Sequence, residues 1–390
     1  MCVLFTGMEW FPECRDGGLD RYLYEEIQAL SSAGVTGTAL FSFSPSSAMA
    51  SMTIRPMAVK GAALWRRLNG ARGGARQAFA EGAELVNSHF ALYAFAYVWD
   101  IPAHVPLVVN FQGPWAEEMR LQRPGLRGRF VGLVAKQIEQ AVYRRATRVI
   151  TLSEAFRQLL HRDYGVPLAR ITAIPGALHL ERYLAAPERR EARRQLGWPA
   201  DRPIILAVRR LAKRMGLHVL IDAMSKVVKE FPEVLLLMGG KGPEADSLQA
   251  AVISRRLERN VRLLGFIAED DLPACYAAAD VSVMPTVALE GFGLSTAESL
   301  ACGTPVLGTP VGATPEILLP LDPNCVFDQA TPEAMANRIK AVLRGDICLP
   351  GAETCQAYVH RYGWPAVVPK ILEVFEEALQ EKREKPGSKF

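Results

Sequence analysis

The chain has 390 residues, of which 49% are hydrophobic and 22% are charged, and its formal net charge at pH 7 is +4. This length exceeds what one ordinary hydrophobic core holds, so two domains are expected. The composition excludes a disordered or fibrous chain, and no apolar run reaches the ~18 residues that a membrane-spanning helix needs.

Short apolar runs alternate with amphipathic segments from the first residues onward, a pattern typical of parallel sheets whose strands are joined by helices. MCVLFTGMEWFPE lacks the basic start and long apolar core of a signal peptide, and is expected to open with a buried strand. In the first half the pattern predicts strands at 2–6, 36–43, 85–88, 106–111, 148–152 and 171–174. In the second half it predicts strands at 203–208, 234–238, 262–265, 281–284 and 305–308.

The segment AAPERR at 185–190 separates the two halves and is followed by a charged helix and Gly197-Trp198-Pro199. The interpretation is an α/β protein with one doubly wound domain at 1–185 and a second at 186–364. Residues 365–390 are then expected to hold a last amphipathic helix, from Pro365 to about Glu381, and a disordered polar tail, EKREKPGSKF.

Basic residues gather in two stretches of the first half. From Arg55 to Arg76 there are six basic residues and no acidic one, and from Arg120 to Arg148 there are eight against Glu139 alone. A solvated face explains such stretches, and the alternative is attraction to an anionic membrane surface or an acidic acceptor. No aromatic interleaving accompanies them, so nucleic acid is not expected as a partner.

The seven cysteines are scattered, with no CxxC pair and no zinc spacing. Reduced thiols in a cytoplasmic protein are therefore expected.

The most informative segment is LEGFGLSTAESLACGTPVLGTP, which begins at Leu289 and places Glu290 and Glu298 on a glycine-rich turn that leads into a helix. Gly291 and Gly293 permit backbone conformations that other residues resist, and a helix N-terminus suits a phosphate. Carboxylates beside amides predict a ligand with both hydroxyls and phosphates, such as a nucleotide sugar. The alternative is a capping box, in which Ser295 caps the helix and Glu298 bonds back to it.

Other unusual segments of the second half also follow predicted strands directly. They are Arg209-Arg210-Leu211, Gly239 to Pro243, Gly265-Phe266-Ile267 and Gly308 to Gly312. Because ligands of such sheets bind beyond the carboxyl ends of the strands, these segments are expected to converge on one site.

Four segments carry a family resemblance: EGFGLSTAESLACGTPV, GFIAEDDLPACYAAADVSVMPT, RRLAKRMGLHVLIDAM and GGLDRYLYEEIQAL. The chain resembles the retaining nucleotide-sugar glycosyltransferases of family 4 over nearly its whole length, apart from the tail and residues 55–80. The resemblance implies the GT-B fold, in which two Rossmann-like domains face each other across a cleft and the C-terminal helix crosses back to the first domain. The first domain would bind the acceptor and the second the donor.

The resemblance also implies roles for individual residues. Glu298 would bond the nucleotide ribose, Glu290 the hydroxyls of the donor sugar, and Arg210 the diphosphate, with Lys241 as a further cation. The remaining donor contacts would be the amides of Gly293, Leu294 and Ser295 at the distal phosphate, Phe266 and Ile267 at the nucleobase, and Gly17 and Gly18 over the phosphates.

The chain departs from the family pattern at several positions, including Ala177 and Ala313, where the family often has glycine. Met215 stands where the family usually has a lysine, and Arg214 beside it is the candidate replacement. Gln112 stands where a histidine is often found, and His89 is a candidate for part of that histidine's role. Glu290, Arg210, His89 and Gln112 are accordingly the candidate catalytic residues.

By this resemblance, a hexose-type sugar would pass from a nucleoside diphosphate to a hydroxyl of a glycan, lipid or small alcohol, with the anomeric configuration kept. UDP is the default, GDP and ADP remain open, and neither a metal nor a cofactor is expected. Two alternatives are a non-hydrolysing sugar-nucleotide epimerase and a non-catalytic sugar-nucleotide binding protein. A dinucleotide oxidoreductase is disfavoured because no G-x-G-x-x-G follows the first strand.

Overall fold

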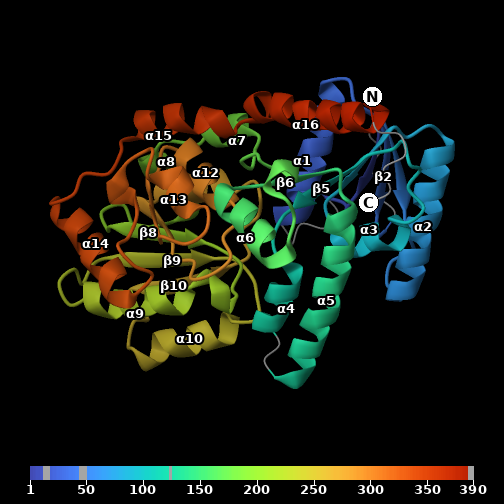
Figure 1. Ribbon diagram of the computed structural model, residues 1–390. Coiled ribbons are helices and arrows are strands. Elements are labelled where there is room, and N and C mark those ends of the chain that lie inside the picture. Colours follow the sequence, from blue (N-terminus) through green and yellow to red (C-terminus); the bar gives the residue numbers. More distant parts are fainter. Residues whose placement is uncertain (12–17, 44–50, 123–124, 385–390) are drawn as a thin grey trace. The chain divides into compact units, whose positions relative to one another are not determined.

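The computed structural model describes residues 1–11, 18–43, 51–122 and 125–384. The chain divides into two compact units (Figure 1). Unit 1 contains Met1–Ala177 and Trp364–Phe390, and unit 2 contains Leu178–Gly363.

In the described part of unit 1, parallel strands form one sheet in the order β3-β2-β1-β4-β5-β6-β7. The strands are β1 (Cys2–Thr6), β2 (Thr36–Phe41), β3 (Met52–Pro56), β4 (Leu85–Ser88), β5 (Leu107–Phe111), β6 (Arg148–Thr151) and β7 (Ile171–Ala173). All six strands predicted for this half are confirmed. The edge strand β3 was not predicted, because four of its five residues are at least partly exposed and give no apolar run.

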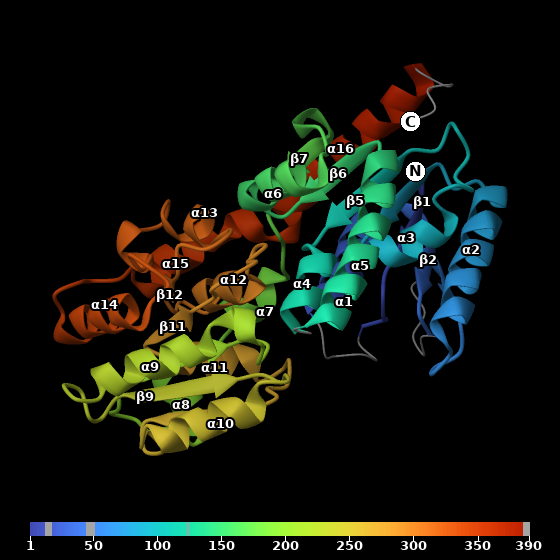
Figure 2. The same ribbon diagram turned by 60° about the horizontal axis from the view of Figure 1, so that its bottom comes forward.

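The helices of unit 1 lie on both faces of its sheet. They are α1 (Gly18–Ser32), α2 (Leu64–Ala80), α3 (Ala91–Tyr97), α4 (Trp115–Gln122), α5 (Leu126–Arg145), α6 (Glu154–Tyr164), η1 (Leu168–Arg170) and α16 (Trp364–Glu384). Helices α2, α3 and α5 share a core with strands β4 and β5 (Figure 2). Helices α1 and α16 pack against each other outside that core. The return of the C-terminal helix to the first domain is thus confirmed.

Helix α16 is longer than expected. It continues through Glu384, because Lys382 is buried and the Arg148 guanidinium pairs with Glu381 and, at 3.5 Å, with Glu377. The prediction of a disordered tail is therefore wrong for residues 381–384, and its remainder, 385–390, lies outside the described residues.

Unit 2 has its own parallel sheet, in the order β10-β9-β8-β11-β12 within the described chain. The strands are β8 (Ile204–Val208), β9 (Leu235–Gly239), β10 (Val261–Gly265), β11 (Val281–Met284) and β12 (Val306–Gly308), each at a predicted position. The helices are α7 (Leu180–Leu184), α8 (Arg189–Leu196), η2 (Lys213–Met215), α9 (Leu217–Val227), α10 (Ala245–Ser254), α11 (Leu272–Ala278), α12 (Leu294–Ala301), α13 (Thr314–Leu318), η3 (Pro323–Cys325), α14 (Pro332–Arg344), α15 (Ala352–Val359) and η4 (His360–Tyr362). Helices α9, α10 and α14 share a core with β8 and β9 (Figure 1).

The boundary between the two units lies between Ala177 and Leu178, whereas the sequence placed the domain boundary at 185/186. Helix α7 packs against α12, and the Leu178 N–H donates to the Tyr362 carbonyl at 3.1 Å, so residues 178–185 belong to unit 2. Over the described ranges, no helix of either unit has the length and hydropathy to cross a bilayer.

Candidate functional site

Three loops of unit 2 are joined at the carboxyl edge of its sheet. The Arg209 N–H donates to the Gly239 carbonyl at 2.9 Å, the Gly240 N–H to the Gly265 carbonyl at 2.7 Å, and the Leu211 N–H to the Lys241 carbonyl at 2.8 Å. The segments that follow β8, β9 and β10 therefore lie together, as their positions after neighbouring strands predicted.

Glu290 is buried in the turn after β11 and forms an ion pair with Arg209. The Thr286 hydroxyl donates to Glu290 Oε2 at 2.8 Å and accepts from Arg209 Nη2 at 2.9 Å. Arg209 is only 8% exposed, and its Nε has no hydrogen-bond partner among the described residues. Sequence reasoning missed Arg209, since the sequence shows two adjacent arginines and does not reveal which of them faces inward.

The other cations of this edge are arranged differently. Arg210 is exposed, and its side chain makes no ion pair or hydrogen bond with any residue that the structure describes. The Lys241 Nζ lies 4.3 Å from the centroid of the Phe266 ring, a cation–π distance. The Ile267 side chain packs over Gly239, so Phe266 lies beside Lys241 and Ile267 beside the end of β9.

Helix α12 begins after Gly293, which adopts a left-handed conformation (φ 77°) as its N-cap. Within the described chain, the N–H groups of Gly293, Leu294 and Ser295 have no hydrogen-bond partner. Ser295 lies inside the helix, where its Oγ accepts from Arg209 Nη1 at 3.2 Å, so it is not the N-cap and the capping-box alternative fails. The helix N-terminus is thus open to an anion.

Glu298 is buried on α12, and its Oε2 accepts a hydrogen bond from the Tyr276 hydroxyl at 2.8 Å. Burial, together with the charge of Glu298, raises the pKa of Tyr276 well above its ordinary value, so this hydroxyl stays a donor. The contact explains how a buried carboxylate is tolerated on a helix that packs against the sheet.

The backbone of the Glu290 turn is held from two sides. Leu289 adopts a left-handed conformation (φ 57°), and its carbonyl accepts from Arg214 Nη1 at 2.8 Å. On the other side the Ala313 N–H donates to the Glu290 carbonyl at 3.0 Å, and a Cβ at Gly312 would come within 2.2 Å of that oxygen. Arg214 therefore contacts the turn itself, whereas Met215 Sδ lies 3.0 Å from Arg209 Nη2.

Unit 1 contains a second buried polar cluster, at the carboxyl ends of β4 and β5. His89 Nε2 lies 3.1 Å from Glu26 Oε1 and 3.0 Å from Asn110 Nδ2, and His89 Nδ1 lies 3.5 Å from Gln112 Nε2. Asn87 Nδ2 also donates to Glu26 Oε1, at 2.9 Å. If His89 Nε2–H donates to Glu26, Nδ1 is left as an acceptor toward Gln112.

The predicted site residues therefore fall into two groups. The structure brings His89 and Gln112 together in unit 1, and it brings the predicted donor residues of unit 2 together at one sheet edge. Gly18 opens helix α1 and is exposed, whereas Gly17 lies outside the described residues. Glu26 was missed, because a glutamate within an amphipathic helix gives no sign of burial. No cluster of three metal-ligating side chains occurs in the described ranges, and the expectation of no metal stays a prediction.

Comparison with known proteins gives consistent matches. The family model described as "Glycosyl transferases group 1" matches residues 188–360, and that described as "Glycosyltransferase Family 4" matches residues 16–182. The D-inositol 3-phosphate glycosyltransferase of Kineococcus radiotolerans is 28% identical over 328 residues, which are 78% of this chain and 74% of that protein.

Two solved structures show a similar fold. Sucrose-phosphate synthase from Thermosynechococcus elongatus superposes with a TM-score of 0.80 at 21% identity, over 97% of this chain and 99% of that one. Anabaena Alr3699/HepE, in complex with UDP-glucose, gives a TM-score of 0.74 at 20% identity, over 97% of this chain and 100% of that one. The two family models leave out only 183–187 between residues 16 and 360, and the chain belongs to the family 4 glycosyltransferases, with the GT-B fold.

Proposed function

We propose that this glycosyltransferase moves a hexose-type sugar from a nucleoside-diphosphate sugar, by default a UDP-sugar, to an acceptor hydroxyl with the anomeric configuration kept. The main support for the proposal is the set of groups found together at the carboxyl edge of the unit 2 sheet. Three N–H groups without a partner in the described ranges open α12, and Arg210, likewise unpaired there, lies on the loop after β8. Two buried carboxylates lie on the same edge. This combination suits a ligand that presents phosphates and hydroxyls together.

In this proposal Glu298 bonds the ribose and Glu290 the donor sugar, while the amides of Gly293, Leu294 and Ser295 hold the distal phosphate. Arg210 and Lys241 neutralise the diphosphate, and the leaving phosphate takes the proton of the attacking hydroxyl on the same face. Each charged hydrogen bond contributes about 1.5–3 kcal/mol. The protein's part is then to stabilise charge on the departing diphosphate.

We infer further that Arg209, rather than Arg214, is the cation that compensates for Met215. Its guanidinium is buried next to the Met215 sulfur, pairs with Glu290 and reaches Ser295 at the start of α12. Arg214 instead bonds the Leu289 carbonyl. Arg209 is therefore a positioning residue that orients the Glu290 carboxylate through their ion pair.

The test begins with thermal unfolding in the presence of UDP, GDP, ADP and NAD. A ligand at about 100 times its Kd adds about 2.7 kcal/mol to the stability of the folded state. A shift with one nucleoside diphosphate supports the proposal and selects the donor series, whereas a shift with NAD alone overturns it.

Turnover is then measured with the matching sugar donors and, first, an inositol phosphate, since the name of the Kineococcus relative points to that acceptor. NMR of the product reports whether the anomeric configuration is kept. A donor that changes without any acceptor would indicate an epimerase. Binding without transfer to any glycan, lipid or small alcohol would indicate a binding protein.

We also infer that the protein works in the cytoplasm and is drawn to anionic surfaces by its basic residues. In the stretch 55–76, Arg55 pairs with Glu81 at 2.7 Å and Arg76 with Asp100 at 2.9 Å. Arg72 pairs with the same aspartate. In the stretch 120–148, Arg129 and Lys136 line a pocket.

A further inference from the structure

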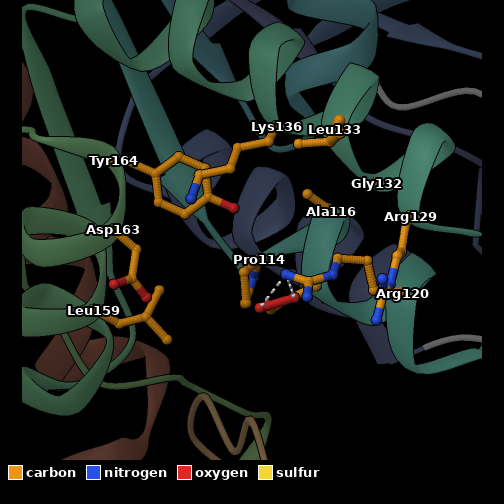
Figure 3. Close-up of a pocket in the computed structure, with 11 residues that line it drawn as sticks. Pro114, Ala116, Arg120, Arg129, Gly132, Leu133, Lys136, Leu159, Asp163 and Tyr164 are labelled. Carbon is orange, nitrogen blue, oxygen red and sulfur yellow. Dashed lines mark hydrogen bonds and ion pairs between the residues drawn. The ribbon is translucent and has the colours of Figure 1, made fainter.

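A pocket of about 350 Å³ lies between helices α4, α5 and α6 of unit 1 (Figure 3). Its lining includes Arg120 from α4, Arg129 and Lys136 from α5, and Tyr164 from α6. The Lys136 Nζ lies 5.5 Å from the centroid of the Tyr164 ring. The pocket is therefore bordered by three cations from two neighbouring helices.

The positive charge of the pocket is only partly neutralised. Glu117 pairs with Arg120 at 3.0 Å, and Asp163 with Arg162 at 2.7 Å, so both acidic residues of the pocket wall already have an arginine partner. The Arg129 guanidinium makes no hydrogen bond or ion pair with the described residues. Besides the hydrogen bond from Arg162, the charge of Lys136 also helps to lower the pKa of the Asp163 carboxyl. The pocket lining holds three cations against two carboxylates, and this excess of positive charge favours an anionic group.

One face of α5 next to this pocket is apolar and exposed. Leu126, Phe130 and Leu133 follow each other at helical spacing and are 82%, 68% and 62% exposed. Leu133 also lines the pocket, so the apolar face and the cations are continuous. Large apolar side chains gathered on the surface of a soluble protein mark an interaction site.

We propose that the α4–α5 surface, meaning the pocket together with Leu126, Phe130 and Leu133, binds an anionic phospholipid bilayer. Arg129 and Lys136 hold the phosphate of a lipid head group, and the three apolar side chains enter the boundary with the acyl chains. A single helix with an apolar ridge flanked by arginines has the form of an interfacial helix. This inference does not depend on the proposed sugar transfer.

Co-sedimentation of the full chain with vesicles tests the proposal. Vesicles of phosphatidylcholine alone are compared with vesicles that also contain phosphatidylglycerol. We expect binding to the anionic vesicles only, weakened by added salt. The double variant Phe130→Ser, Leu133→Ser is expected to weaken this binding at least about tenfold, because each apolar side chain loses its burial in the bilayer. The variant Arg129→Glu, Lys136→Glu should abolish the preference for anionic lipid.

Matched controls are Ile253→Ser, 54% exposed on unit 2, and Arg262→Glu, also exposed there, both expected to bind as the unchanged protein does. Thermal unfolding and nucleotide binding of every variant show that folding and the donor site are intact. The proposal is overturned if neutral vesicles bind equally or if both double variants bind normally. It is also overturned if inorganic phosphate blocks vesicle binding while the variant Phe130→Ser, Leu133→Ser still binds the vesicles. The same holds if this variant only converts a dimer to a monomer.

Discussion

The two units stabilise buried carboxylates in different ways. In unit 2 Glu290 is paired with the buried guanidinium of Arg209. In unit 1 Glu26 is fully buried without an arginine or lysine partner among the described residues, where its Oε1 meets the Asn87 amide and the His89 ring and its Oε2 has no partner. Glu139 is likewise surrounded by neutral donors, namely two backbone N–H groups of α4 and two tyrosine hydroxyls.

This difference has a physical consequence. Removing one partner of a buried ion pair leaves the other charge buried and uncompensated, which is strongly destabilising. The stability contributed by a buried carboxylate among neutral donors depends instead on its protonation. Unit 2 should therefore be sensitive to substitution of one charge, and unit 1 to pH and to changes in hydrogen bonding.

The largest effect is expected for Glu290→Ala. Removing the carboxylate leaves the Arg209 charge buried and alone, which should lower the free energy of unfolding by about 3–5 kcal/mol. Transfer should fall about ten- to a hundredfold through loss of the bond to the donor sugar, while the nucleoside diphosphate still binds. Urea unfolding, transfer kinetics and nucleotide titration measure the three quantities.

The control is the double variant Arg209→Met, Glu290→Ala, which removes both charges. It should recover most of the lost stability but none of the transfer. Equal loss of donor and nucleoside-diphosphate affinity in Glu290→Ala would show that the turn had collapsed. Full stability in the single variant would show that the pair is not buried in solution.

The second prediction concerns Glu298, whose carboxylate accepts from Tyr276. Glu298→Ala should weaken binding of the nucleoside diphosphate about ten- to a hundredfold, since a charged hydrogen bond to the ribose is worth about 1.5–3 kcal/mol. Tyr276→Phe removes only the internal bond, and should lower stability more than affinity. Calorimetric titration measures the affinity of both variants for the nucleoside diphosphate. Unchanged affinity in Glu298→Ala would leave that residue a purely structural role.

The strands and the Glu290 turn were predictable from sequence for a local reason. Strands buried on both faces read as apolar runs, and the turn with its following helix occupies consecutive residues. Glu26 and Arg209 were not predictable, because their burial is created by distant parts of the chain. Asn87 comes from β4 to meet Glu26, and Thr286 lies beyond β11 beside Arg209. The residues next to Glu26 and Arg209 in the sequence therefore do not indicate either contact.

The third prediction is a pH dependence that originates at Glu139. Burial raises the pKa of this carboxyl from 4.5 to about 6, although Tyr164, Tyr143 and two backbone N–H groups donate to it. A raised pKa means that the folded state holds the proton more tightly. The stability gained from this group is therefore complete below about pH 4.5 and is lost as the pH rises through 6.

Relative to Glu139→Gln, whose amide does not titrate, the unchanged protein should lose about 2 kcal/mol of unfolding free energy between pH 4 and pH 7.5. Urea unfolding of both proteins across that range measures the difference. A constant difference at all pH values would contradict the account of Glu139 as a carboxylate held only by neutral donors.

The fourth prediction concerns the cluster at His89. Glu26→Gln keeps the size of the side chain but removes the charge that orients the ring. Transfer to the acceptor should fall about tenfold, with nucleoside-diphosphate affinity unchanged, if this cluster serves the acceptor. Normal transfer would make the cluster a structural element of unit 1.

The smallest effect is expected for Arg214→Ala, which tests whether Arg214 or Arg209 compensates for the methionine at 215. Arg214 donates to the carbonyl of the strained Leu289, so its loss should loosen the turn that presents Glu290, at a cost of about 1 kcal/mol. The KM for the sugar donor should then rise about fivefold, while the Kd for the nucleoside diphosphate, which lacks the sugar, stays the same. Lys213→Ala, an exposed neighbour in the same short helix, is the matched control. A parallel loss of affinity for donor and nucleoside diphosphate would instead place the Arg214 charge on the phosphates and remove the reason for assigning compensation to Arg209.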